Sequence, residues 1–317
     1  MASSSVGRTM MGLAREMRVT VPGGHLAGKM WGSQDGPPIL CLHGWSDNSA
    51  SFDTLIPHLP PEFHYVALDL PGHGHSSHRP PGVMIHFSDY LLDLQRLVSA
   101  LKFEKFSILG HSMGGNIGGL FSSTFPEKVD KLVLLDTLGF LPSAEELLQN
   151  TLHSAVMDFF SYEQQIAKVP KVYSNDGILQ RLLSANQQLT EESAKLLLKR
   201  GARKTPEGYV FNRDFRINLH LPERMGLTHC LKLQKKLCAQ VLIVLASDGW
   251  LKDALESYRF IELMKAYKCM KNVRNINKSP SYIFLFNLCF FYLCLFPLQY
   301  FIIPQKTRFC FFFSDLS

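Results

Sequence analysis

The stretch Ile108-Leu109-Gly110-His111-Ser112-Met113-Gly114-Gly115 decides the fold of this chain. It reads G-x-S-x-G, and it lies between an apolar run at 105–109 and a run of small residues at 116–119. The apolar run predicts a buried strand, and the small run predicts a helix that packs close against it. The turn between them places Ser112 in a strained backbone conformation, where Gly110 and Gly114 lack the Cβ atoms that would collide. The stretch therefore predicts a nucleophile elbow that lifts the Ser112 hydroxyl clear of the sheet.

Apolar runs and amphipathic segments alternate on both sides of this elbow. The expected elements are a hairpin over 17–31, buried strands at 38–42, 65–68, 129–135 and 239–245, and helices near 52–59, 87–101 and 255–269. This alternation predicts an α/β fold with a mostly parallel sheet flanked by helices.

The strand rhythm stops between residues 138 and 238, where helical segments at 145–160, 177–185 and 191–200 predict a helical lid inserted over the sheet. The expected organisation is an N-terminal extension at 1–16, the core at 17–137, the lid at 138–238, the continued core at 239–270 and an atypical apolar tail at 271–317.

The bulk composition excludes several classes of protein. The formal net charge of +6 over 317 residues is not arranged as a basic stripe interleaved with aromatic residues, so we expect no nucleic-acid partner. The seven cysteines lack CxxC spacing, which favours reduced thiols over a disulfide scaffold. Residues 1–15 contain no apolar segment of the kind that a secretory signal needs, so we expect none.

Four motifs together resemble the α/β-hydrolase superfamily, and within it the serine hydrolase-like proteins, over about residues 17–270. They are Leu42-His43-Gly44-Trp45, the loop from Asp69 to Ser76, the elbow from Gly110 to Gly115, and the apolar strand that ends at Asp248. The resemblance implies a carboxylesterase-like serine hydrolase that cleaves a small ester-like substrate through an acyl-enzyme, without a cofactor. It also implies a location in the cytoplasm (perinuclear) and in peroxisomes. The sequence sets no oligomeric state.

The site residues follow from the elbow and from this resemblance. Ser112 is the expected nucleophile, and the backbone N–H groups of Met113 and Trp45 are the expected oxyanion hole. The resemblance gives His43 and Gly44 the role of shaping the loop that carries Trp45. It also argues against a metal site where histidines cluster near Asp69, so none is expected.

Two aspartates compete for the role of the acid that orients a catalytic histidine. Asp248 follows the strand downstream of the lid, and Asp136 follows the strand next to the elbow strand. The usual order of serine, acid and histidine along the chain favours Asp248 and leaves Asp136 as the alternative.

No histidine follows Asp248, because the last one in the chain is His229. The sequence therefore predicts impaired catalysis, with a non-catalytic binding protein as the alternative function. Residues 279–305 carry no charged side chain, which leaves three interpretations open: a membrane segment, a buried strand at 282–286, or an alternative terminus that replaces the last strand and closing helix of the fold.

Overall fold

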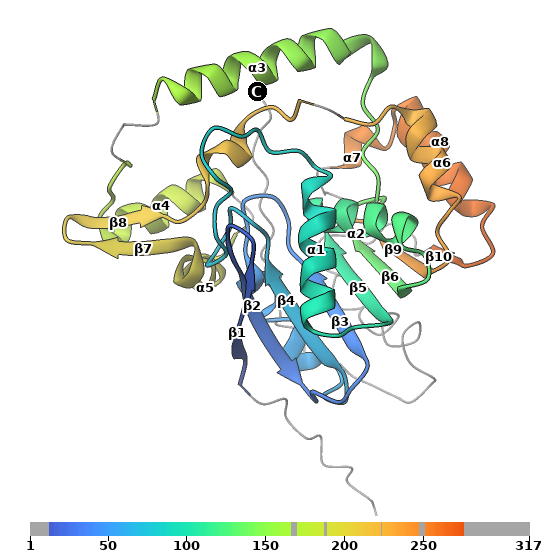
Figure 1. Ribbon diagram of the computed structural model, residues 1–317, viewed down its shortest axis with the longest axis horizontal. Helices are drawn as coiled ribbons and strands as arrows, with labels where there is room; N and C mark the ends of the chain where they lie inside the picture. The colour runs from blue at the N-terminus through green and yellow to red at the C-terminus, as the bar shows by residue number, and fades with distance from the viewer. Residues whose placement is uncertain (1–12, 166–169, 187–188, 223, 247–250, 276–317) are drawn as a thin grey trace, which may run out of the picture.

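An eight-stranded sheet forms the centre of the computed structural model, which describes residues 13–165, 170–186, 189–222, 224–246 and 251–275 (Figure 1). In spatial order its strands are β1 (Arg15–Val21), β2 (Gly24–Gly32), β4 (His64–Asp69), β3 (Pro38–Leu42), β5 (Phe106–His111), β6 (Val129–Leu135), β9 (Gln240–Val244) and β10 (Val273–Asn275). The pairs β1–β2 and β2–β4 are antiparallel, and all other neighbours are parallel. The predicted α/β architecture with a mostly parallel sheet is confirmed.

The central strands are apolar on both faces because both faces are covered. In β3, Leu40 and Leu42 pack into one hydrophobic cluster, while Ile39 and Cys41 pack into the cluster on the opposite face. Strand β6 divides its side chains in the same way. Side chains alternate between faces along a strand, so a continuous apolar run fills two cores at once.

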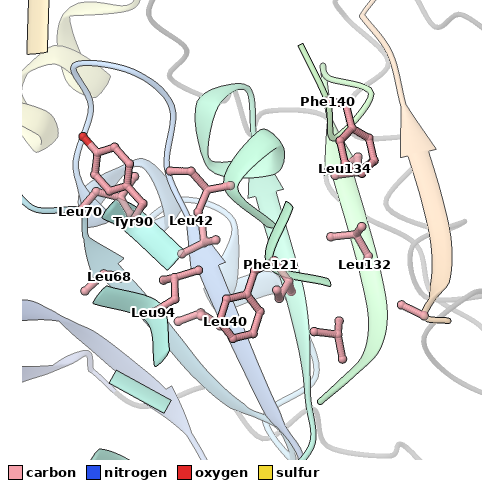
Figure 2. Packing of buried hydrophobic residues seen from close by; sticks show 14 of the residues in the cluster. Leu40, Leu42, Leu68, Leu70, Tyr90, Leu94, Phe121, Leu132, Leu134 and Phe140 are labelled. Atoms are coloured by element: carbon pink, nitrogen blue, oxygen red, sulfur yellow. The ribbon is translucent and has the colours of Figure 1, made fainter. Parts of the chain in front are cut away.

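Five α-helices contribute to the larger cluster, part of which is drawn in Figure 2: α1 (Asp89–Ala100), α2 (Met113–Thr124), α6 (Leu227–Gln234), α7 (Leu251–Ala254) and α8 (Tyr258–Lys268). Helix α2 contacts β3, β5 and β6, and α1 and α6 pack against α2. The central place of α2 fixes its first residue at the edge of the sheet, directly after the elbow.

The opposite face is covered by two short 3₁₀ helices, η1 (Ser49–Phe52) and η2 (Ile56–His58). The sequence predicted a single helix near 52–59, and this prediction was wrong in type. Pro57 lies inside η2, and a proline within an α-helix removes a hydrogen bond and clashes with the preceding turn, which favours short, interrupted pieces here.

The lid contains α3 (Leu148–Glu163) after the short 3₁₀ helix η3 (Glu145–Leu147), then α4 (Asn175–Ala185) and α5 (Glu191–Gly201). The sequence predicted a helical lid, but this segment also contains strands. Strands β7 (Ala202–Thr205) and β8 (Gly208–Phe211) form an antiparallel hairpin, and the 3₁₀ helix η4 spans Phe215–Asn218. Figure 1 shows α3 across the top of the molecule and the hairpin beside α4 and α5.

The hairpin escaped detection because β7 carries exposed charged residues in place of an apolar run. Arg203 and Lys204 are both exposed, so the strand shows no apolar pattern in the sequence. Its turn at Pro206 ends in Gly208, whose φ of +149° suits glycine alone.

The sheet also continues beyond the predicted end of the core at residue 270. Strand β10 lies in the segment that we assigned to the tail, and it pairs in parallel with β9. Residues 276–317, including the apolar stretch 279–305, lie outside the described residues. Within the described part of the chain, no helix is long and apolar enough to cross a bilayer.

Candidate active site

Ser112 occupies the turn between β5 and α2 with φ 47° and ψ −116°, a conformation that non-glycine residues rarely adopt. Its backbone N–H donates to the Leu135 carbonyl at 2.9 Å, and its carbonyl accepts from the Asn116 N–H at 3.0 Å. These two bonds tie the turn to β6 on one side and to α2 on the other. The strained serine is therefore held by the surrounding structure, as strain at functional sites usually is.

The glycines around Ser112 allow very close backbone contacts. A Cβ atom on Gly110 would lie 2.5 Å from Gly115 Cα. A Cβ atom on Gly114 would lie 2.3 Å from the Leu42 carbonyl oxygen. The start of α2 thus abuts the end of β3 and the loop that follows it.

Replacing Gly114 with alanine should lower the free energy of unfolding by about 2 kcal/mol or more, because the added methyl group meets rigid backbone oxygens. The control is Gly201→Ala at the end of α5, where the nearest atom would be the Asn48 side-chain nitrogen at 3.3 Å. Urea unfolding of both variants measures the difference. Equal stability of Gly114→Ala and the unchanged chain would contradict the close approach.

The two backbone N–H groups expected to form the oxyanion hole lie on either side of this contact. Met113 begins α2, and Trp45 follows the end of β3 by three positions along the chain. In the described part of the chain, neither N–H donates to a backbone carbonyl. Donors without an internal acceptor at a helix N-terminus are suited to stabilise a developing negative charge.

The loop that carries Trp45 is fixed by two buried imidazole rings. His43 Nδ1 donates to the Gly44 carbonyl at 2.7 Å, and its Nε2 accepts from the Leu70 N–H at 3.0 Å. His73 Nδ1 donates to the Pro71 carbonyl at 3.2 Å, and its Nε2 accepts from the Ser46 N–H at 3.3 Å. Each ring thus joins the loop after β3 to the loop after β4.

Burial holds both rings in the neutral form that these bonds require. It lowers the pKa of His43 to about 4 and the pKa of His73 to about 3. His43 therefore has no ring nitrogen left for proton transfer, and its geometry suits the shaping of the loop.

No hydrogen bond between described residues joins a histidine ring to the Ser112 hydroxyl. All twelve histidines lie in the described part of the chain. His111 is buried beside the elbow, and a Cβ atom on Gly44 would lie 2.8 Å from its Nδ1. Burial lowers the pKa of His111 to about 3. The last histidine, His229, is exposed on α6.

Asp136, the alternative acid, follows β6 with φ 50° and is only 2% exposed. Its N–H donates to the Val244 carbonyl at 2.7 Å, and its Oδ1 accepts from the Ala246 N–H at 3.2 Å. The carboxylate therefore lies where β6 and β9 end side by side. Asp248, the acid that the sequence favours, lies outside the described residues, so its role stays a prediction.

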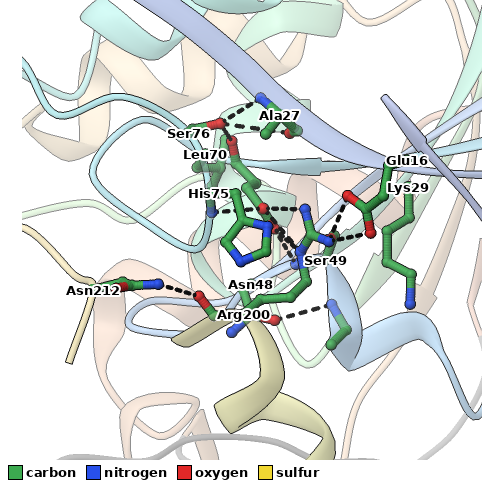
Figure 3. Close-up of polar contacts among 12 residues, drawn as sticks. Glu16, Ala27, Lys29, Asn48, Ser49, Leu70, His75, Ser76, Arg200 and Asn212 are labelled. Carbon is green, nitrogen blue, oxygen red and sulfur yellow. Dashed lines mark hydrogen bonds and ion pairs between the residues drawn. The ribbon is translucent and has the colours of Figure 1, made fainter. Parts of the chain in front are cut away.

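A buried ion pair that the sequence did not reveal joins the lid to the core (Figure 3). Arg200 of α5 donates to both carboxylate oxygens of Asp69, with its Nη2 2.7 Å from Oδ2, and it also contacts Glu16 of β1. Asp69 accepts in addition from the Ser49 N–H at 2.7 Å and the His75 N–H at 2.9 Å.

This carboxylate links the lid, the loop after β4 and η1, which directly follows the loop that carries Trp45. Burial raises the pKa of Asp69, but Arg200 and the two N–H donors outweigh it and leave the pKa below its usual value. Only the position of Asp69 at a strand end could have drawn attention to it in the sequence.

The described residues contain no group of three histidine, cysteine, aspartate or glutamate side chains that could hold a metal ion. The donors around Asp69 are the guanidinium of Arg200 and backbone N–H groups, which repel a cation. His73 directs its ring nitrogens to backbone partners, which does not suit a metal ligand.

Comparison with known proteins identifies the family of this chain. A profile described as the alpha/beta hydrolase fold matches residues 37–262. A serine hydrolase-like protein of Danio rerio is 44% identical over 245 residues, covering 77% of this chain and 75% of the relative. Serine hydrolase-like protein 2 of Homo sapiens is 44% identical over 253 residues, covering 78% of this chain and 79% of the relative.

The solved structures include a hypothetical protein from Pseudomonas aeruginosa PAO1 with a TM-score of 0.74 and 31% sequence identity, covering 84% of this chain and 91% of that one. On this evidence, the chain belongs to the alpha/beta hydrolase fold family, and its similar relatives are named serine hydrolase-like proteins.

Proposed function

We propose that this protein is a serine hydrolase in which Ser112 forms an acyl-enzyme with an ester or a similar acyl compound. The conformation of Ser112 carries the proposal, because the strained turn presents the hydroxyl beside the first N–H of α2. In the proposed reaction the hydroxyl attacks the carbonyl carbon, and the negative charge on the carbonyl oxygen is stabilised by the N–H groups of Met113 and Trp45. Water then releases the acid and regenerates the serine.

We further propose that this chain performs the reaction slowly, because among the described residues no histidine ring is hydrogen-bonded to the Ser112 hydroxyl to take its proton. His43 and His73 use both ring nitrogens to hold the loops, and the sequence contains no histidine after His229. A serine without a base stays protonated and is a weak nucleophile. The alternative function is a binding protein that retains the site and the lid without turnover.

Labelling with a fluorophosphonate probe tests both parts of the proposal. We expect slow labelling that is lost in Ser112→Ala and kept in Ser122→Ala, since the Ser122 hydroxyl lies within α2 and donates to the Gly118 carbonyl. Free imidazole in the buffer should accelerate labelling, since it supplies the missing base. Hydrolysis of p-nitrophenyl acetate should be slow and should exceed that of Ser112→Ala only slightly.

The outcomes separate the two parts. Rapid turnover that depends on Ser112 would show that a base acts on it and would contradict the proposed impairment. Labelling that persists in Ser112→Ala would contradict the role of Ser112 as the nucleophile. Absence of labelling with and without imidazole, together with specific binding of an ester, would favour the binding protein.

A membrane contact through residues 279–305 and a cytoplasmic or peroxisomal location are also proposals. The charge-free composition of that stretch supports the membrane contact. The resemblance of the sequence to the serine hydrolase-like proteins supports the location. Fractionation of the full chain and of a chain ending at Asn275 tests the membrane contact. Sedimentation with membranes that resists salt and is lost on truncation is the expected result.

A further inference from the structure

Arg213 of the lid lies against the loop that carries Trp45. It follows β8 and is half-buried, and its Nη1 donates to the Ser46 hydroxyl. Its guanidinium carbon lies 6.0 Å from the centre of the Trp45 ring and 5.8 Å from that of Phe211. The guanidinium thus lies near two aromatic rings. One of them, Trp45, directly precedes Ser46 in the chain.

Three other arginines in the lid and its neighbours are paired with carboxylates. Arg200 binds Asp69, Arg216 binds Asp214 at 2.7 Å, and Arg79 binds Asp93 at 2.6 Å. Arg213 forms no ion pair with an acidic residue in the described part of the chain. The hydrogen bond to Ser46 uses one of the five N–H donors of the guanidinium, and burying a charge without a counter-charge is costly.

The surroundings of Arg213 add positive charge. Burial lowers its pKa, and the nearby charge of Arg181 on α4 lowers it further. Lys171 lies over the ring of Tyr173 at 5.2 Å, and Tyr173 packs edge-on against Phe211. Among the described residues these cations form no ion pair with an acidic side chain, and a group of positive charges of this kind attracts an anion.

We propose that Arg213 binds an oxyanionic group, carboxylate or phosphate, carried by the substrate at a distance from the bond to be cleaved. This rests on the proposed function, because Ser46 and Trp45 connect Arg213 to the loop expected to bind the reacting carbonyl. The planar fork of a guanidinium matches two oxygens of such a group, and the flanking rings hold the fork in place. The substrate class is therefore an ester or similar acyl compound with an anionic end.

Equilibrium binding tests this without any need for catalysis. All measurements use the full chain with Ser112→Ala, so a failure of the proposed nucleophile does not affect them. Isothermal titration compares 4-phenylbutyrate and phenyl phosphate with the neutral 4-phenylbutyramide. We expect at least one anion to bind roughly tenfold or more tightly than the amide, which is typical of a hydrogen-bonded charge.

Arg213→Gln should weaken binding of that anion by roughly tenfold and leave binding of the amide unchanged. Arg203→Gln is the matched control, since Arg203 is exposed on β7 and its loss changes the net charge equally. Tighter binding of 4-phenylbutyrate or of phenyl phosphate identifies whether the site prefers a carboxylate or a phosphate.

A purely structural role for Arg213 would give a different result. Ser46→Ala removes the hydrogen bond to the loop and keeps the guanidinium charge, so it should retain the preference for the anion. The proposal is overturned if Arg213→Gln weakens binding of the anion and binding of the amide equally. It is also overturned if neither anion binds more tightly than the amide, or if Arg203→Gln has the same effect.

Discussion

Lowering the pH from 6.5 towards 4 should destabilise the protein steeply, by about 3 kcal/mol for each pH unit. The cause is the set of buried imidazoles around the two loops, since burial lowers the pKa of His43 to about 4 and those of His73 and His111 to about 3. In the unfolded chain all three take up protons near pH 6.5, the ordinary value for histidine. In the folded chain these rings take up protons only when the pH falls to their much lower pKa values.

The sign follows from the count of bound protons. Between pH 6.5 and about 4 the unfolded chain holds three more protons on these rings than the folded chain does, so falling pH favours unfolding. Asp47 works against this, because burial raises the pKa of its carboxyl well above the usual value, so the folded chain takes up that proton at a higher pH than the unfolded chain does. Three imidazoles at about 1.4 kcal/mol per pH unit each set an upper limit of about 4 kcal/mol, and the opposing proton uptake at Asp47 reduces the expected slope to about 3 kcal/mol.

Urea unfolding at pH 7, 6 and 5 measures this slope. His73→Gln, whose side-chain oxygen can accept from the Ser46 N–H, should reduce the slope by about 1.4 kcal/mol per pH unit because glutamine does not titrate. His229→Gln is the control, since His229 is exposed on α6. A stability that stays constant from pH 7 to pH 5 would show that these rings are not held neutral by burial.

Replacing Arg200 with methionine should lower the free energy of unfolding by about 3–5 kcal/mol at pH 7. Methionine fills much of the same volume but leaves the Asp69 carboxylate, which is 0% exposed, without its counter-charge. The bond from Arg200 to Glu16 adds little, because the Glu16 side chain is 65% exposed and water screens it. Most of the loss therefore arises at Asp69.

A double-mutant cycle isolates this contribution. Arg200→Met combined with Asp69→Asn should be more stable than Arg200→Met alone, because the amide carries no charge and can still accept from one of the two N–H donors. Arg203→Met serves as the control for loss of an exposed arginine. Additive effects of the two substitutions would mean that the pair is not coupled, which the 2.7 Å contact does not allow.

Most strands of the sheet, the elbow and the α/β order of the core could be predicted from the amino-acid sequence. Apolar runs such as Ile39 to Leu42 fill two cores at once, so they can be recognised from neighbouring residues alone. The same is true of Gly110 and Gly114, because the turn around Ser112 is a local steric problem. The hairpin β7–β8 was missed, since exposed Arg203 and Lys204 give a strand no apolar pattern.

Which charged side chains meet became visible only in the folded arrangement of the chain. Arg200 and Asp69 are 131 residues apart along the chain, and Trp45 donates its indole N–H to the Ile217 carbonyl across 172 residues. Whether Arg213 finds an acidic partner depends equally on the path of the lid over the sheet. Local patterns fix what each segment becomes, but an ion pair depends on how distant segments are brought together, and no short-range pattern encodes that distance.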